Sequence, residues 1–203
     1  MQAFLRQNAI VNLISQNDEK LLWEKHVFDS LSIEKFFEKY LHLSLGEGNI
    51  STRSMSVKNS GVKLLDIGTG GGFPAVPIAL TYPDLKVTAL DSIRKKINAI
   101  ENIKQELNIQ NLTTICNRAE NLAEKFDIIT SRAVASLDKI CTYALPLLKK
   151  DGYFIAYKSR KTPEEIADAE KILKKYHAKI IDIIEYKLPL EENFTRNLII
   201  IKG

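Results

Sequence analysis

The most constraining feature of this chain is an alternation of short apolar runs and amphipathic segments from residue 62 onward. Apolar runs of about five residues predict buried strands, and apolar residues at three- and four-residue spacing predict helices. Strands that alternate with helices form a parallel sheet that carries helices on both faces. The predicted strands are 62–67, 86–90, 112–116, 126–130 and 153–157, and the predicted helices are 73–80, 93–107, 119–124, 136–148 and 164–176.

The last two predicted strands, 179–186 and 197–201, have no helix between them. The connecting residues KLPLEENFTR suit a hairpin, which joins antiparallel strands. The sequence therefore predicts an α/β fold: a doubly wound, mostly parallel, seven-stranded Rossmann-like sheet whose last strand is antiparallel. In such a sheet the turns that follow the strands lie at one edge, where ligands bind.

The residues before this sheet follow a helical pattern from about residue 4 to residue 40, with an expected break at Asn17 and Asp18. The polar segment 46–61 is typical of a connection between two parts of a chain. We therefore expect residues 1–61 to form an N-terminal helical extension with a linker, and residues 62–203 to form the main domain.

Composition limits the kind of protein but does not identify it. The 203 residues carry a net charge of +4, which permits an anionic partner without requiring one. Cys116 and Cys141 form no metal-binding pattern, so no metal is expected. No apolar run approaches the roughly 18 residues of a membrane span, and the first residues lack the pattern of a secretory signal. These features favour a cytoplasmic protein, and a monomer is expected.

The segment LLDIGTGGGFP, residues 64–74, ends the first predicted strand in a glycine-rich loop. A phosphate-binding P-loop is excluded because no lysine follows the glycines, and a dinucleotide fingerprint fits only in its weaker form. Asp66 stands two residues before Gly68, where a carboxylate suits a cationic or hydroxyl-rich ligand. The pattern of Asp66 followed by glycines at alternate positions, including Gly68 and Gly70, resembles the first motif of class I S-adenosylmethionine-dependent methyltransferases.

Two further strand ends agree with that resemblance. Asp91 ends the second predicted strand, and a carboxylate there can accept both ribose hydroxyls of a nucleoside. Ala119 and Glu120 follow the third strand, where a backbone amide and a carboxylate can read an adenine edge.

The fourth and fifth strand ends carry the candidate catalytic residues, Arg132 and Lys158. Both are cations that suit an anionic or oxygen-rich acceptor, such as RNA. Cys116 lies within a predicted strand and Cys141 within an amphipathic helix, so neither suits a nucleophile. The run 93–96, IRKK, is expected on the exposed face of its helix.

From residue 12 onward the chain resembles the bacterial ribosomal RNA small subunit methyltransferase G (GidB) family. The resemblance is carried by HVFDSL (26–31), DIGTGGGFPAVPIAL (66–80), LDS (90–92), RAE (118–120), SRAVASL (131–137), LPLLKKDGYFIAYK (145–158) and RNLIIIK (196–202). It implies methyl transfer from S-adenosylmethionine to N7 of a guanine in 16S rRNA, with naked rRNA, the small ribosomal subunit or an assembly intermediate as partner. It also implies that Gly68, Phe73, Ala119, Glu120 and Arg132 occupy cofactor-contact positions.

Guanine N7 carries an in-plane lone pair, so no general base is assigned. The rate of methyl transfer is expected to depend on the alignment of the base with the methyl group and on stabilisation of the charge that develops. The chain departs from the family at Ala75, where glycine is usual, and in a short helical region followed by a long linker. His26 falls in a family motif but is expected to be a packing residue. Two other functions stay open: a class I methyltransferase with another substrate, and a non-catalytic RNA-binding or assembly protein.

Overall fold

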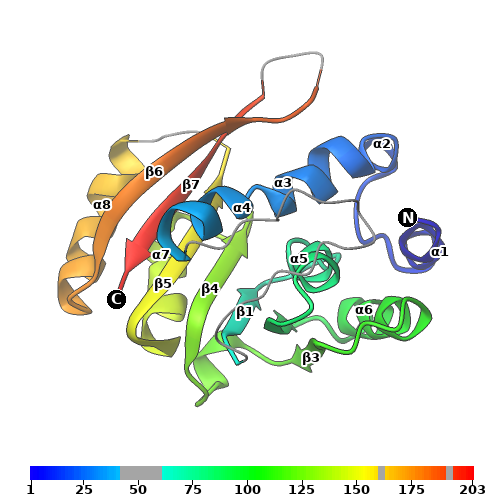
Figure 1. Ribbon diagram of the computed structural model, residues 1–203, viewed down its shortest axis with the longest axis horizontal. Helices are drawn as coiled ribbons and strands as arrows, with labels where there is room; N and C mark the ends of the chain where they lie inside the picture. The colour runs from blue at the N-terminus through cyan, green and yellow to red at the C-terminus, as the bar shows by residue number, and fades with distance from the viewer. Residues whose placement is uncertain (42–60, 160–162, 191–193) are drawn as a thin grey trace.

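The computed structural model describes residues 1–41, 61–159, 163–190 and 194–203, and it contains a seven-stranded sheet between layers of helices (Figure 1). The strand order is β3-β2-β1-β4-β5-β7-β6. Strands β1 to β5 are parallel, and β7 is antiparallel to both of its neighbours, as predicted. The strands are β1 (Lys63–Ile67), β2 (Lys86–Asp91), β3 (Leu112–Cys116), β4 (Phe126–Arg132), β5 (Leu148–Lys158), β6 (Lys179–Lys187) and β7 (Thr195–Lys202).

Strand β1 lies next to the central strand, β4, and the chain reverses its direction of winding between these two strands. The chain leaves β1 toward β2 and β3, and then crosses back to place β4 on the other side of β1. The carboxyl ends of β1, β2 and β4 therefore meet at one edge, which is where a doubly wound sheet binds its ligands.

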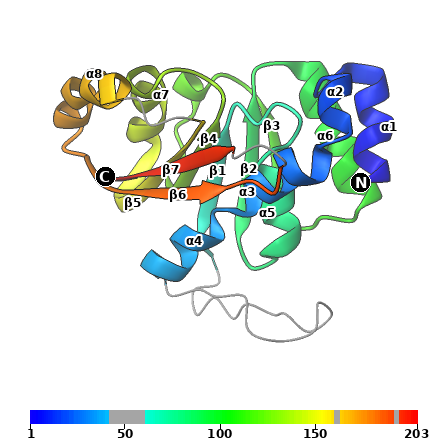
Figure 2. The ribbon, with the colours of Figure 1, turned by 90° about the horizontal axis from the view of Figure 1, so that it is seen from above.

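The two faces of the sheet bury separate hydrophobic clusters because successive side chains of a strand point in opposite directions. Leu64 belongs to one cluster and Leu65 to the other. The N-terminal helices, α5 and α6 cover the first face, and α7 and α8 cover the second (Figure 2). The helices and helical turns are α1 (Gln2–Val11), α2 (Gln16–Glu19), η1 (Leu22–Val27), α3 (Phe28–Leu31), α4 (Glu34–Phe36), η2 (Phe37–Leu41), α5 (Ala75–Thr81), α6 (Arg94–Glu106), η3 (Ala119–Asn121), α7 (Leu137–Ala144), η4 (Leu145–Leu147) and α8 (Pro163–Lys175).

The N-terminal helices pack directly on the sheet. Phe36 and Phe37 are fully buried, and their rings contact Tyr153 and Tyr82 at centroid distances of 5.1 and 4.9 Å. Large buried aromatic side chains dominate such contacts. The helical extension thus shares a core with the sheet, while the division at residue 61 stays a prediction, because residues 42–60 lie outside the described part.

Some element boundaries were predicted wrongly. The expected break at Asn17 and Asp18 falls inside α2; the chain turns earlier, where Asn12 adopts the left-handed conformation with φ of 52° and Ser15 caps the next helix. The helix expected over 136–148 ends at Ala144, because Pro146 follows in a 3₁₀ turn and cannot continue the α-helical bonding. Strand β5 consequently begins five residues earlier than expected.

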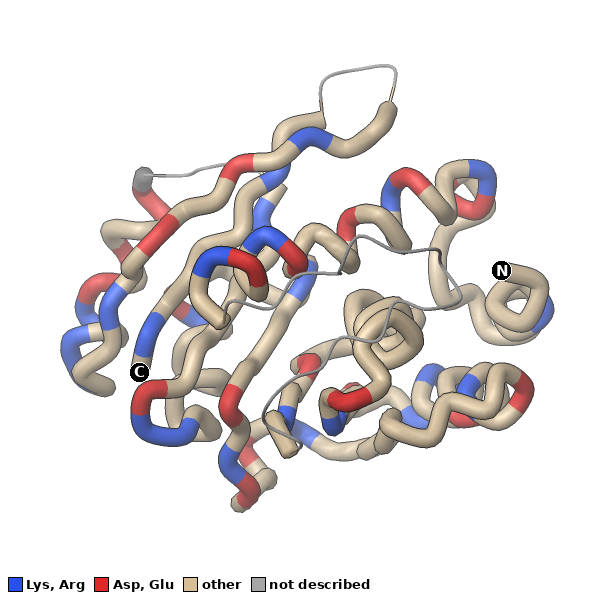
Figure 3. The backbone as a smooth tube through the Cα atoms, viewed as in Figure 1, with Lys and Arg blue, Asp and Glu red and all other residues tan. Residues whose placement is uncertain are grey.

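Charges of both signs are interspersed along the helices, so the net charge alone does not define an anion-binding face (Figure 3). Among the described residues, no helix is long and apolar enough to cross a membrane.

Candidate active site

The glycine loop after β1 uses backbone conformations that glycine adopts readily. Gly68 has φ of +70° and Gly70 has φ of +57°, in the left-handed region that residues with a side chain rarely adopt. A Cβ atom at Gly68 would lie 2.5 Å from Cγ2 of Val134, so the loop and the segment after β4 approach each other closely. The absence of side chains exposes the backbone of the loop to the adjoining cavity.

Asp91 anchors this loop to the end of β2. Its Oδ2 accepts a hydrogen bond from Gly70 N–H at 2.9 Å, and its Oδ1 accepts one from Ile93 N–H at 2.9 Å. A carboxylate offers about four lone-pair sites, so each oxygen keeps one for a ligand. The carboxylate is therefore held in a fixed orientation and can still accept hydrogen bonds from the hydroxyl groups of a ligand.

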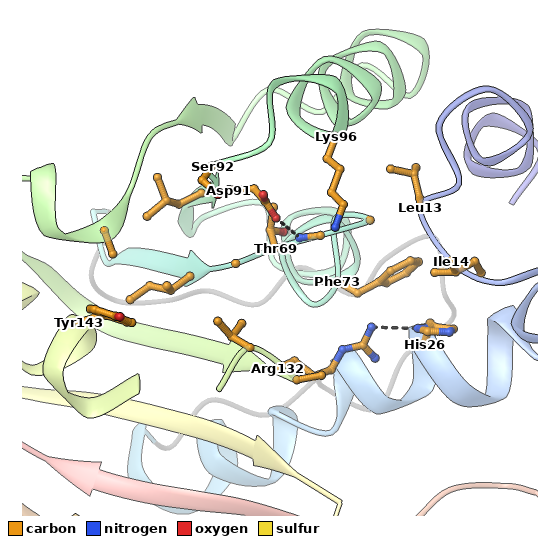
Figure 4. Close-up of a pocket in the computed structure, with 18 of the residues that line it drawn as sticks. Leu13, Ile14, His26, Thr69, Phe73, Asp91, Ser92, Lys96, Arg132 and Tyr143 are labelled. Carbon is orange, nitrogen blue, oxygen red and sulfur yellow. Dashed lines mark hydrogen bonds between the residues drawn. The ribbon is translucent and has the colours of Figure 1, made fainter. Parts of the chain in front are cut away.

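A cavity of about 630 Å³ lies above this edge of the sheet (Figure 4), within the usual range for small-molecule sites. Seven of the eight predicted cofactor residues line it: Gly68, Gly70, Phe73, Asp91, Ala119, Glu120 and Arg132. They come from the ends of four different strands, and the sheet topology brings them together.

Asp66, the eighth predicted cofactor residue, is not among those that line this cavity. It is fully buried beneath the loop, and its Oδ1 accepts a hydrogen bond from Thr130 Oγ1 at 3.0 Å. Burial raises the pKa of its carboxyl to about 7, and the hydroxyls of Thr69 and Thr130 and the charge of Arg132 oppose this only in part. The structure thus places Asp66 as a support of the loop and not at the cavity wall.

Arg132 ends β4, and its guanidinium is held on several sides. Nη1 donates to Asp29 Oδ2 at 3.0 Å, Nη2 donates to His26 Nδ1 at 2.9 Å, and the Phe73 ring centroid lies 5.4 Å from Cζ. Burial and the neighbouring Arg132 lower the pKa of His26 to about 4, so the imidazole is neutral at pH 7 and Nδ1 can accept.

The expectation that His26 is only a packing residue was incomplete. It does pack on Phe73, at a ring-centroid distance of 5.2 Å, but it also lines the cavity and contacts Arg132. Its position in the HVFDSL motif was the signal in the sequence that could have revealed this role.

Lys158 ends β5 and lies in a second cavity of about 310 Å³, not in the first. Its Nζ donates to Ala135 O at 2.9 Å and to Glu165 Oε1 at 3.0 Å. The two cavities share part of their lining: Asp29, Arg132, Ala133, Val134 and Arg196. Arg132 therefore stands between the two cavities, and Lys158 faces the second. Arg160, Lys161 and the expected helix cap Thr162 lie outside the described residues.

Lys96 lines the first cavity, although it was expected on an exposed helix face. Arg94 and Lys95 are exposed as expected, but Lys96 is half-buried and points toward the glycine loop (Figure 4). Spacing within α6 cannot reveal this, because the cavity wall is completed by residues from other segments. Within the described chain, no group of three or more His, Cys, Asp or Glu residues could hold a metal ion.

Comparison with known proteins identifies the family of this chain. A family model described as "GidB: rRNA small subunit methyltransferase G" matches residues 49–194. The chain belongs to this family. The ribosomal RNA small subunit methyltransferase G of Lachnoclostridium phytofermentans is 37% identical over 96% of this chain and 75% of that protein, and the one of Trichodesmium erythraeum is 40% identical over 96% and 73%.

Solved structures of other methyltransferases share the fold of this GidB family member. Precorrin-6y C5,15-methyltransferase from Geobacter metallireducens matches 81% of this chain and 95% of its own, with a TM-score of 0.54 and 12% identity. A SAM-dependent O-methyltransferase from Thermotoga maritima matches 71% and 60%, with a TM-score of 0.53 and 17% identity. At these identities the likeness concerns the fold alone, whereas family membership makes the chain a methyltransferase of small-subunit rRNA.

Proposed function

We propose that this protein transfers a methyl group from S-adenosylmethionine to N7 of a guanine in 16S rRNA. The observation that carries the proposal is the pair of adjoining cavities, which share Arg132 at the carboxyl end of β4. The larger cavity has the lining that a nucleoside-containing cofactor needs, and the smaller one presents cations to an acceptor. Methyl transfer requires two such sites side by side.

The lining of the larger cavity fits S-adenosylmethionine part by part. The free lone pairs of Asp91 suit the ribose hydroxyls, and Ala119 and Glu120 suit the adenine. Gly70 has no side chain and nearly open space around it, which allows a close approach, and Lys96 is the cation that would face the carboxylate of the amino-acid part. When bound, this cofactor supplies a methyl group that is attached to a positively charged sulfur. After the transfer, the sulfur remains as the neutral thioether of the leaving group.

The smaller cavity suits the base that receives the methyl group. Arg132, Lys158 and Arg196 line it, together with Asp29 and Glu165, which pair with Arg132 and Lys158. The remaining donors of these cations can address guanine O6 or RNA phosphates. Guanine N7 needs no deprotonation, so the residues around it have only to hold the base in line with the methyl group. An unpaired guanine fits this requirement, because proteins read RNA bases mainly in accessible single strands.

The activity is tested by mass mapping of methylated guanines. Purified protein, S-adenosylmethionine and either naked 16S rRNA or small subunits are incubated, and N7-methylguanine is expected at one site. Arg132→Ala should lower the transfer at least a hundredfold, whereas Arg94→Ala, which removes an exposed arginine on α6, should leave it unchanged. Wild-type turnover in Arg132→Ala would refute the role of Arg132.

The other functions give different results in the same experiments. A methyltransferase with another substrate would transfer methyl groups without regard to rRNA and without steep salt dependence. A non-catalytic RNA-binding protein would bind RNA but give no heat with S-adenosylmethionine in calorimetry.

A further inference from the structure

Arg132 is held by a carboxylate that comes from the N-terminal helices. Asp29 lies on α3, is only 3% exposed, and accepts from Arg132 Nη1 through Oδ2 at 3.0 Å. Its other oxygen, Oδ1, accepts from the hydroxyl of Tyr186 on β6 at 2.6 Å. Burial, with Asp29 beside it, keeps the pKa of Tyr186 well above its ordinary value, so this hydroxyl is a donor. One buried carboxylate thus joins three segments that are more than fifty residues apart in the chain.

The backbone next to Asp29 is fixed as well. The hydroxyl of Tyr157 on β5 donates to Ser30 O at 2.8 Å, and both of these residues are buried. Asp29 is therefore tied to the sheet through its side chain at β6 and through its neighbour at β5. A carboxylate held in this way can impose its orientation on the guanidinium that it contacts.

The hydrogen bonds of Arg132 run to the N-terminal helices. Nη1 donates to Asp29 Oδ2 at 3.0 Å and to Lys25 O at 3.5 Å, and Nη2 donates to His26 Nδ1 at 2.9 Å. A guanidinium has five donors in a rigid plane, so the others remain for the two cavities that Arg132 lines. Rotation of the plane would direct those donors elsewhere.

We propose that Asp29 and Tyr186 are positioning residues for methyl transfer, which set the orientation of Arg132 between the two cavities. This inference rests on the proposed function. A buried ion pair is a poor source of stability, because desolvation offsets its attraction, and its advantage lies in the geometry that it imposes. The N-terminal helices are accordingly part of the active site, and their length and sequence determine activity as well as packing.

The test uses Asp29→Asn, Tyr186→Phe and a matched control, Asp182→Asn. Asp182 on β6 also ties the N-terminal helices to the hairpin, through Tyr40 and Lys39 at 2.8 and 2.6 Å, but it lines neither cavity. We expect Asp29→Asn to lower kcat at least tenfold and Tyr186→Phe to lower it about threefold, with less than a threefold change in the KM for RNA. Asp182→Asn should retain the wild-type kcat.

A double-mutant cycle separates positioning from a general loss of structure. If Asp29 acts through Arg132, then Asp29→Asn should have no further effect on kcat in an Arg132→Ala background. The shifts in thermal unfolding midpoint should also be non-additive, because each single substitution leaves a buried partner unpaired; this readout does not depend on activity.

Three results would overturn the inference: additive effects in the cycle, a wild-type kcat in folded Asp29→Asn, or an equal loss in Asp182→Asn. If Tyr186→Phe folds but Asp29→Asn does not, a wild-type kcat in Tyr186→Phe would also overturn the inference. A wild-type protein that leaves 16S rRNA unmethylated would instead refute the proposed function.

Discussion

The buried carboxyl of Asp66 makes the stability of this protein depend on pH in a way that can be measured. Burial raises its pKa from the ordinary 3.8 to about 7, a shift of about three units. The folded state therefore binds this proton more tightly than the unfolded state. The resulting contribution to stability is fully present below about pH 4 and is lost as the pH rises toward 7.

The size of the effect follows from the same shift. One pKa unit corresponds to about 1.4 kcal/mol, so the complete change is about 4 kcal/mol. Between pH 5 and pH 8, which avoids acid denaturation, the linkage relation leaves roughly 2 to 3 kcal/mol of this change. Asp66→Asn has nearly the same shape and never ionises, so it removes this dependence.

Urea unfolding followed by circular dichroism at pH 5 and pH 8 provides the assay. Relative to Asp66→Asn, the wild-type protein should lose roughly 2 to 3 kcal/mol of unfolding free energy on going from pH 5 to pH 8. Asp182→Asn is the control, because the hydrogen bond from Lys39 lowers the pKa of Asp182 and confines its titration to lower pH. Parallel curves for the wild type and Asp66→Asn would refute the reasoning.

Three further substitutions test the loop, the cavity and the core. Gly68→Ala should weaken S-adenosylmethionine binding measured by calorimetry, because of its positive φ and the contact with Val134, and a second change, Val134→Ala, should restore part of the affinity. Lys96→Ala should raise the Kd for S-adenosylmethionine about tenfold and weaken its salt dependence, whereas Lys95→Ala should change neither. Phe36→Ala should lower the free energy of urea unfolding by about 3 to 5 kcal/mol, because the ring is fully buried between the helices and the sheet; an effect below 1 kcal/mol would contradict that packing.

The sheet and the position of its ligand edge were predictable because their causes are local. Apolar periodicity determines which segments are strands and which are helices, and short crossovers then place strand ends together. Gly68, Gly70 and Asp91 could be predicted as cavity residues for that reason. The break between the first two helices was misplaced, because Asn17 and Asp18 look as much like a helix boundary in the sequence as Asn12, where the first helix actually ends.

The sequence by itself determined the alternating fold, the glycine loop and the residues at the strand ends, because each depends on spacing within one segment. Tertiary structure alone decided that Asp66 is buried, that Lys96 enters the cavity, and that Lys158 faces a second one. It also decided that Asp29 meets Arg132. Such contacts join segments that are distant in the chain, and only the packing of helices on a twisted sheet determines which polar side chains meet.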